Sequence, residues 1–92
     1  MDLGLKGRKA ILIGANASVG RHTAEILAQE GCAVALCGRT QEKVDRVVAT
    51  VRSFGVDAFG QAVDVSDAQA LPAFIDAAAD ALGGCDIFIS FV

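Results

Sequence analysis

A tight turn of small residues near the start of the chain separates an apolar run from a helical pattern. The apolar run ends at Ile13, Gly14 follows it, and helical spacing begins before Gly20. A backbone with little side chain can approach a ligand closely, and the first N–H groups of a helix, with its dipole, attract anions. The turn therefore predicts a phosphate site, unless it is a strand-to-helix turn without a ligand. The candidate binding residues here are Gly14, Asn16, Ser18, Val19 and Gly20.

Arg39 directly follows the next apolar run. In dinucleotide-binding folds, an acidic residue at about this distance from the glycine turn accepts hydrogen bonds from the adenosine ribose and selects NAD. Here Gly38 and Arg39 stand in its place, and a guanidinium offers a fork of donors that matches phosphate oxygens. Arg39 thus predicts the 2′-phosphate of NADP as its partner, with NAD the weaker candidate. The alternative is a solvated arginine at a helix start.

Two further polar positions are associated with the later apolar runs. Asp64 could accept the adenine amino group while Val65 packs against the ring, or its carboxylate could instead cap the turn that begins at Ser66. Ser90 lies in the last apolar run of the chain. In open parallel sheets, ligands lie beyond the carboxyl ends of the strands. We therefore expect these positions to lie at the same edge as the glycine turn.

Strand and helix patterns alternate along the chain and position these residues. Apolar runs predict strands at Lys9–Ile13, Ala33–Cys37, Ala58–Val63 and Ile87–Val92. Helical spacing predicts helices at Ser18–Glu30, from a Thr40 cap to Gly55, and from a capping box of Ser66 and Gln69 to Gly83. Pro72 leaves the start of the third helix open by several residues. The order βαβαβαβ predicts an α/β fold, part of a Rossmann-like, doubly wound parallel sheet of about four strands and three helices.

Each predicted helix carries an apolar stripe that should face the sheet. The stripe of the first helix consists of Val19, Thr23, Ile26 and Leu27. The stripe of the second helix consists of Val44, Val47, Val48 and Val51. The stripe of the third helix consists of Leu71, Phe74, Ile75, Ala78 and Leu82.

Composition limits the class of protein. The 92 residues suit one domain, 1–92, and 53% of them are hydrophobic, which favours strands buried on both faces. A net charge of −3 without a basic stripe argues against a nucleic-acid partner. No apolar stretch approaches the roughly 20 residues of a membrane helix, and the N-terminal residues lack the apolar core of a signal peptide. We therefore expect no membrane partner.

The three cysteines are Cys32, Cys37 and Cys85, and His22 is the single histidine. No Cys-x-x-Cys pair is present, so a zinc site is not expected. The pattern favours small buried side chains in a reducing compartment. We therefore expect a cytoplasmic protein.

Together these motifs resemble the short-chain dehydrogenase/reductase family, from about Leu5 to the last residue. The family's glycine motif, Thr-Gly-x-x-x-Gly-x-Gly, matches at Gly14 and Gly20, with Ile13 for the threonine and Ser18 for the middle glycine. The resemblance implies a partial NAD(P)-binding Rossmann domain.

Three later segments extend this resemblance. Cys37–Thr40 resembles the family's NADP-preferring version of the strand end, and Asp64–Val65 resembles its adenine-binding Asp-Val. Gly83–Ile89 resembles the run before the family's Asn-Asn-Ala-Gly motif, which braces the sheet and contacts the cofactor ribose. Ser90–Val92 stands where Asn, Asn and Ala would be, and Phe91 cannot supply the hydrogen bonds of an asparagine.

The resemblance implies hydride transfer between NADP(H) and a carbonyl or alcohol. The family's Tyr-x-x-x-Lys pair lies beyond the fourth strand, whereas this chain has no tyrosine, and Lys6, Lys9 and Lys43 match no catalytic position. We therefore expect no catalytic residue here. The expected function is the NADP(H)-binding half of a truncated oxidoreductase, not catalytic alone. The alternative is a non-catalytic nucleotide-binding or sensing module.

The last apolar run, Ile87–Val92, would pair with a further strand in the full family fold. Without that strand it forms an apolar sheet edge, which is a template for pairing with another chain. We therefore expect self-association through this edge.

Overall fold

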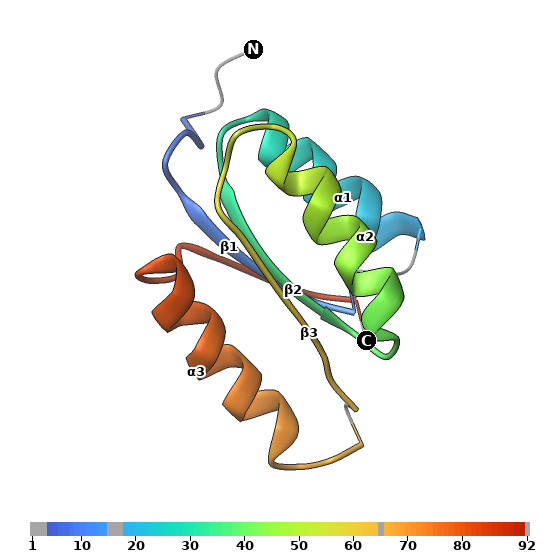
Figure 1. Ribbon diagram of the computed structural model, residues 1–92. Coiled ribbons are helices and arrows are strands. Elements are labelled where there is room, and N and C mark those ends of the chain that lie inside the picture. The colour runs from blue at the N-terminus through green and yellow to red at the C-terminus, as the bar shows by residue number, and fades with distance from the viewer. Residues whose placement is uncertain (1–3, 15–17, 65, 92) are drawn as a thin grey trace.

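The chain folds into a parallel β-sheet with helices on both sides (Figure 1). The computed structural model describes residues 4–14, 18–64 and 66–91. Within these ranges the strands are β1 (Lys9–Ile13), β2 (Ala33–Gly38), β3 (Ala58–Ala62) and β4 (Ile87–Ser90). The helices in the same ranges are α1 (Ser18–Gln29), α2 (Gln41–Arg52) and α3 (Ala70–Leu82). The sheet order is β3-β2-β1-β4 with every neighbouring pair parallel, which confirms the predicted partial Rossmann-like α/β fold.

Most boundaries lie within a residue of the predicted ones. α1 ends at Gln29, one residue early, β2 extends to Gly38, and β3 ends at Ala62. The last strand is shorter than predicted, since β4 ends at Ser90 and Val92 lies outside the described residues.

Side chains of the central strands alternate between two apolar clusters. Ala10 and Leu12 of β1 belong to the cluster that includes α1 and α2, whereas Ile11 and Ile13 belong to the cluster that includes α3. All four are at most 1% exposed. Successive residues of a strand point to opposite faces, so the predicted apolar run is buried because helices cover both faces of β1 (Figure 1).

The predicted inner stripe of α1 is wrong, apart from Leu27. Val19 is 68% exposed and Ile26 is 44% exposed. The buried positions of this helix are Gly20, Ala24, Leu27 and Ala28. Small residues four apart let the helix axis lie close to the sheet, so residue size outweighed hydrophobicity in choosing the face.

The predicted inner stripe of α2 is confirmed, since its four valines are all buried. Close packing against β3 depends on Gly60, where a Cβ would lie only 2.6 Å from a methyl carbon of Val44. Thr40 is the N-cap residue, as predicted, and has extended backbone, but no side-chain hydrogen bond supports the cap.

The predicted capping box at the start of α3 is wrong. Ser66 donates from its N and Oγ to Asp64, and the helix begins only after Gln69, which makes no side-chain cap. The delayed start places Pro72 in the first turn, where its missing N–H has no intrahelical acceptor to lose. α3 ends at Leu82, and Gly83 caps it with φ +79, as the predicted glycine stop requires.

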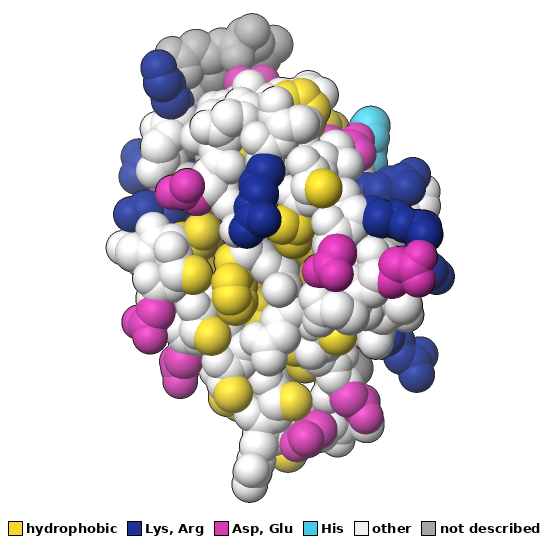
Figure 2. All heavy atoms as spheres, in the orientation of Figure 1, with side chains coloured by type: hydrophobic (Ala, Val, Ile, Leu, Met, Phe, Trp, Pro, Cys, Tyr) yellow, Lys and Arg dark blue, Asp and Glu magenta, His cyan; other side chains and the backbone are white. Residues whose placement is uncertain are grey.

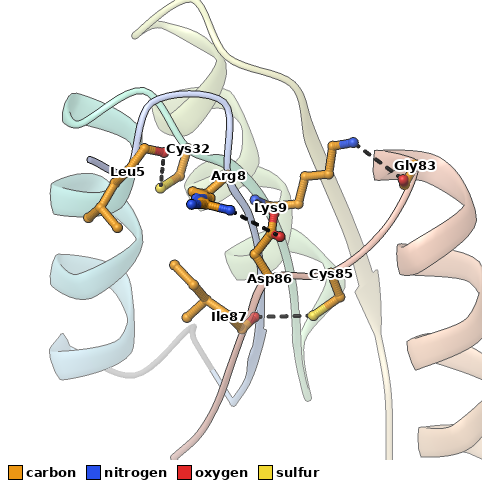
Figure 3. A network of polar contacts seen from close by, with 8 residues as sticks. All are labelled: Leu5, Arg8, Lys9, Cys32, Gly83, Cys85, Asp86 and Ile87. Carbon is orange, nitrogen blue, oxygen red and sulfur yellow. Dashed lines mark hydrogen bonds and ion pairs between the residues drawn. The ribbon is translucent and has the colours of Figure 1, made fainter. Parts of the chain in front are cut away.

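Asp86 joins the beginning of β4 to the beginning of β1 (Figure 3). Its Oδ2 accepts a hydrogen bond from the Lys9 N at 2.9 Å, and its own N donates to the Lys9 O at 2.8 Å. Arg8 Nη1 lies 3.7 Å from Asp86 Oδ1, and Lys9 Nζ donates to the Gly83 O at 3.3 Å. These contacts favour the observed β1–β4 register, which sets the position of the opposite ends of both strands.

None of the helices in the described ranges is long and apolar enough to cross a membrane.

Candidate functional site

The carboxyl ends of the strands lie side by side along one edge of the sheet. In the register of the sheet, Ile13 at the end of β1 pairs with Cys37 of β2 and with Ser90 of β4. Gly38 at the end of β2 pairs with Ala62 of β3. The segments that carry the predicted binding residues therefore begin from the same edge, as in other open parallel sheets that bind ligands.

Backbone hydrogen bonds extend this alignment past the strand ends. Gly14 N donates to Cys37 O at 2.9 Å, and Phe91 N donates to Ile13 O at 2.9 Å. Val63 N donates to Gly38 O at 2.8 Å. These hydrogen bonds fix the backbone at the points where the segments with the predicted binding residues begin.

Gly14 turns the chain out of β1 with φ +82, a left-handed conformation that glycine adopts without a Cβ penalty. α1 then begins at Ser18, and its first turn contains no acidic side chain. Ser18 and Val19 are exposed, while Gly20 is buried. Asn16 lies outside the described residues. The described part of the turn therefore has an open helix start whose positive end no acid of that turn neutralises.

Arg39 follows β2 directly and is exposed. Its positive charge contributes to lowering the pKa of Asp64. These two predicted residues, which stand far apart in the sequence, therefore lie close enough to interact electrostatically.

Asp64 closes a local turn, so its carboxylate takes the capping role that was the alternative to binding adenine. Its Oδ1 accepts hydrogen bonds from the Ser66 N at 2.9 Å and from the Ser66 Oγ at 2.7 Å. The Ser66 hydroxyl is the largest cause of the lowered pKa of Asp64, followed by the Ser66 backbone N–H, while desolvation opposes the shift. Oδ2 makes no hydrogen bond with the described part of the chain. Val65 lies outside it.

Ser90 ends β4 beside Ile13, next to the glycine turn. The following residue, Phe91, packs its ring against the apolar cluster that includes α1 and α2. An aromatic side chain at this place thus adds to the core instead of donating polar contacts along the edge.

The sequence did not predict the cationic pocket that lies beside this edge. It lies between α1 and α2, has a volume of about 270 Å³, and is lined by Ser18, Arg21, Lys43, Arg46 and Val47. Lys43 and Arg46 are three residues apart on one helix, so they share a face. The spacing of the Arg and Lys residues on the two predicted helices was the sequence signal that could have indicated this pocket.

Two of the lysines lie away from the predicted cofactor edge. The chain has no tyrosine. Lys9 begins β1, so it and Lys6 before it lie toward the amino ends of the strands, away from the predicted cofactor edge.

Known proteins match this chain over nearly its whole length. Residues 8–91 match the family model of the short chain dehydrogenase. A short-chain reductase, NovJ of Streptomyces niveus, is 37% identical over 81 residues, covering 88% of this chain and 31% of that protein. The 3-oxoacyl-[acyl-carrier-protein] reductase FabG of Staphylococcus aureus is 32% identical over 84 residues, covering 90% of this chain and 34% of FabG.

Solved structures give the same result. The crystal structure of an NAD⁺-bound xylitol dehydrogenase superposes with a TM-score of 0.87 at 31% identity, covering 91% of this chain and 32% of that one. The chain spans about a third of the length of the curated relatives it matches. The parallel sheet and the glycine at the end of β1 agree with these matches. The chain belongs to the short-chain dehydrogenase/reductase family.

Proposed function

We propose that this chain is the NADP(H)-binding half of a short-chain oxidoreductase that transfers hydride between NADP(H) and a carbonyl or alcohol. The observation that carries the choice of NADP is Arg39, an exposed guanidinium directly after β2 where an NAD-selecting fold has an acid. The donors of a guanidinium match the oxygens of a phosphate, whereas a ribose hydroxyl offers no comparable set of acceptors. The NAD⁺-bound neighbour supports the dinucleotide class but not this choice.

The described residues fit such a cofactor. Gly14 leaves the backbone open at the turn, and the acid-free start of α1 would hold the pyrophosphate. Arg39 would hold the 2′-phosphate, and the Oδ2 of Asp64 would accept the adenine amino group. Ser90 would lie toward the ribose on the nicotinamide side, because β4 ends beside β1. When bound, the cofactor would supply hydride to a carbonyl as NADPH or accept it from an alcohol as NADP⁺.

We further propose that the chain by itself binds cofactor without turnover. General acid catalysis needs a donor within reach of the substrate carbonyl, and the chain contains no tyrosine to act as one. The full activity of its relatives belongs to proteins about three times as long. The three free thiols support a reducing, cytoplasmic location.

The edge strand β4 supports one partner proposal. It pairs with β1 on one side, and within the described residues no strand pairs with its other side. We propose that two copies of the chain associate through this edge.

Titration of NADPH and NADH fluorescence against the chain tests the cofactor proposal. We expect tighter binding of NADPH, and Arg39→Ala should weaken it by about ten- to hundredfold, as a lost charged hydrogen bond does. Binding of NADH should change little. Lys6→Ala, an exposed cation lost from the opposite edge, is the matched control and should leave both affinities unchanged.

Equal losses for the two cofactors would refute the 2′-phosphate role of Arg39. No fluorescence change at millimolar cofactor would refute the binding function as a whole.

A further inference from the structure

The pocket between α1 and α2 is a second place where the chain presents positive charge. Its lining includes two arginines and a lysine from two helices, together with Ser18. Figure 2 shows Lys and Arg side chains gathered along the side of the molecule where these helices lie. At about 270 Å³ the pocket is smaller than the roughly 300–1,000 Å³ of sites that enclose a whole ligand. It suits one end group of a larger molecule.

The charge of this pocket is only partly neutralised by the protein. Arg46 pairs with Glu42 on the same helix. Within the described residues, Arg21 and Lys43 make no hydrogen bond or ion pair with an acid. Like charges brought together from two helices repel each other, so an anion between them would relieve the repulsion.

The pocket adjoins the predicted cofactor site. Ser18 is the first residue of α1 and so belongs to the phosphate-binding turn as well as to the pocket. Lys43 lies in the first turn of α2, four residues after Arg39. Residues 15–17 of the turn, Ala-Asn-Ala, bring no cation of their own. A group held by Arg39 would therefore have the pocket as its nearest further source of positive charge.

A phosphomonoester has the charge that this arrangement requires. It carries about −1.5 to −2 charges at pH 7, which is more than one arginine neutralises. Arginine offers a planar fork of donors and lysine a mobile point charge, so the pair can accommodate the oxygens from two sides. A ribose hydroxyl offers neither the charge nor the oxygens.

We infer that Arg21 and Lys43 form, with Arg39, a three-cation clamp on the 2′-phosphate of the cofactor, so that selectivity for NADP is read from the α1–α2 pocket as well as from the end of β2. This inference rests on the proposed function. It assigns Arg21 and Lys43 as specificity-determining residues for a site whose turn lacks a cation.

Calorimetric titration of the chain at low salt with adenosine 2′,5′-bisphosphate and with ADP tests the clamp. Both probes carry two phosphates, but only the bisphosphate has one on the ribose 2′-oxygen, whereas ADP has both on the 5′-oxygen. We expect Arg21→Gln and Lys43→Gln each to weaken the bisphosphate roughly five- to tenfold, since exposed cations contribute less than buried ones. Binding of ADP should change less than twofold. Lys43→Glu should weaken the bisphosphate further.

Lys6→Gln is the control for loss of one positive charge, and it should leave the ratio of the two affinities unchanged. Because Arg21 and Lys43 are exposed, their variants should keep the far-ultraviolet circular dichroism of the parent chain.

The outcomes separate this inference from the function on which it rests. If Arg39→Ala abolishes the preference for the bisphosphate while Arg21→Gln and Lys43→Gln leave it intact, the clamp is wrong and the proposed function stands. Equal weakening of both probes by these variants also overturns the clamp, because it shows a general charge effect. If the parent chain binds neither probe, both proposals fall.

Discussion

β1 and β4 are neighbouring strands of similar apolar character in opposite environments. Ala10–Ile13 of β1 is at most 1% exposed, whereas Phe88 in the middle of β4 is 52% exposed. β1 has a strand on each side, and helices pack on both of its faces. In the described structure β4 pairs only with β1, and α3 packs on β1, β2 and β3 but not on β4. An apolar run therefore indicates a strand, but its neighbours decide how much of it is buried.

The largest expected difference between the two strands is in stability. Leu12→Ala should lower the free energy of unfolding by about 2–5 kcal/mol, because it leaves a cavity between the sheet and the helices. Phe88→Ala should lower it by less than about 1 kcal/mol, because half of that ring is already in water. Urea denaturation of both variants measures the difference. Equal losses would show that β4 is covered in solution.

Removal of the hydrogen bond between the Asp86 side chain and the Lys9 N–H should have an intermediate effect on stability. Asp86→Ala deletes the acceptor of the Lys9 N–H and should cost about 1–2 kcal/mol, less than a buried charged hydrogen bond. Arg8→Ala should cost under about 0.5 kcal/mol, since that ion pair is exposed and 3.7 Å long. Thermal unfolding compares the two variants, with Asp80→Ala on α3 as a control. A larger loss for Arg8→Ala would mean that the ion pair, not the hydrogen bond, holds β4.

The thiols at β2, which pairs with β1, and just before β4 differ in burial and therefore in reactivity. Burial raises the pKa of the Cys37 thiol on β2 above its ordinary value of 9.0, and burial is also the main cause of the raised pKa of Cys32. Cys85, just before β4, is exposed. A thiol reagent at pH 8 should label Cys85 rapidly and the other two only after unfolding. Rapid labelling of all three in the native chain would contradict the buried arrangement.

The same raised pKa values determine the sign of the stability change in alkali. The unfolded thiols lose their protons first, so their contribution to stability is complete below about pH 9 and falls as the pH rises further. Urea midpoints measured above and below pH 9 check this direction. Replacing Cys37 with Ala should reduce the pH dependence.

The smallest effect on stability is expected from a charge at the exposed edge. Phe88→Lys should leave the free energy of unfolding nearly unchanged but reduce self-association through β4, because a lysine at an edge disfavours strand addition. Sedimentation velocity at increasing concentration measures the association. A parent chain that stays monomeric at high concentration, with a cooperative melt, would refute the edge proposal.

The helices show how far the sequence alone could predict packing. On α2 the hydrophobic stripe is also the buried face, because its valines are both apolar and the right size to pack beside Gly60. On α1 the two criteria conflict, and Gly20 and Ala24 are buried while Val19 is exposed. Periodicity locates a helix reliably, whereas the face it buries depends on how close the sheet lies.

The candidate site shows the same division. The glycine turn, Arg39 and Asp64 were identified as separate loci, and their expected alignment along one edge follows from the parallel order of the strands. The electrostatic influence of Arg39 on Asp64 could be found only in the folded chain. The α1–α2 pocket could also be found only in the folded chain, because the two helices that supply its cations become neighbours only when both pack on the sheet.

The sequence by itself determined the order of elements and the parallel sheet, and its motifs indicated the family. These follow from local patterns, since strand runs, glycine turns and helical spacing are properties of neighbouring residues. Only the tertiary structure decided which face of α1 is buried, that Asp64 binds Ser66, and that Arg21 and Lys43 share a pocket. Those outcomes depend on distances between segments that the chain brings together only when the sheet forms.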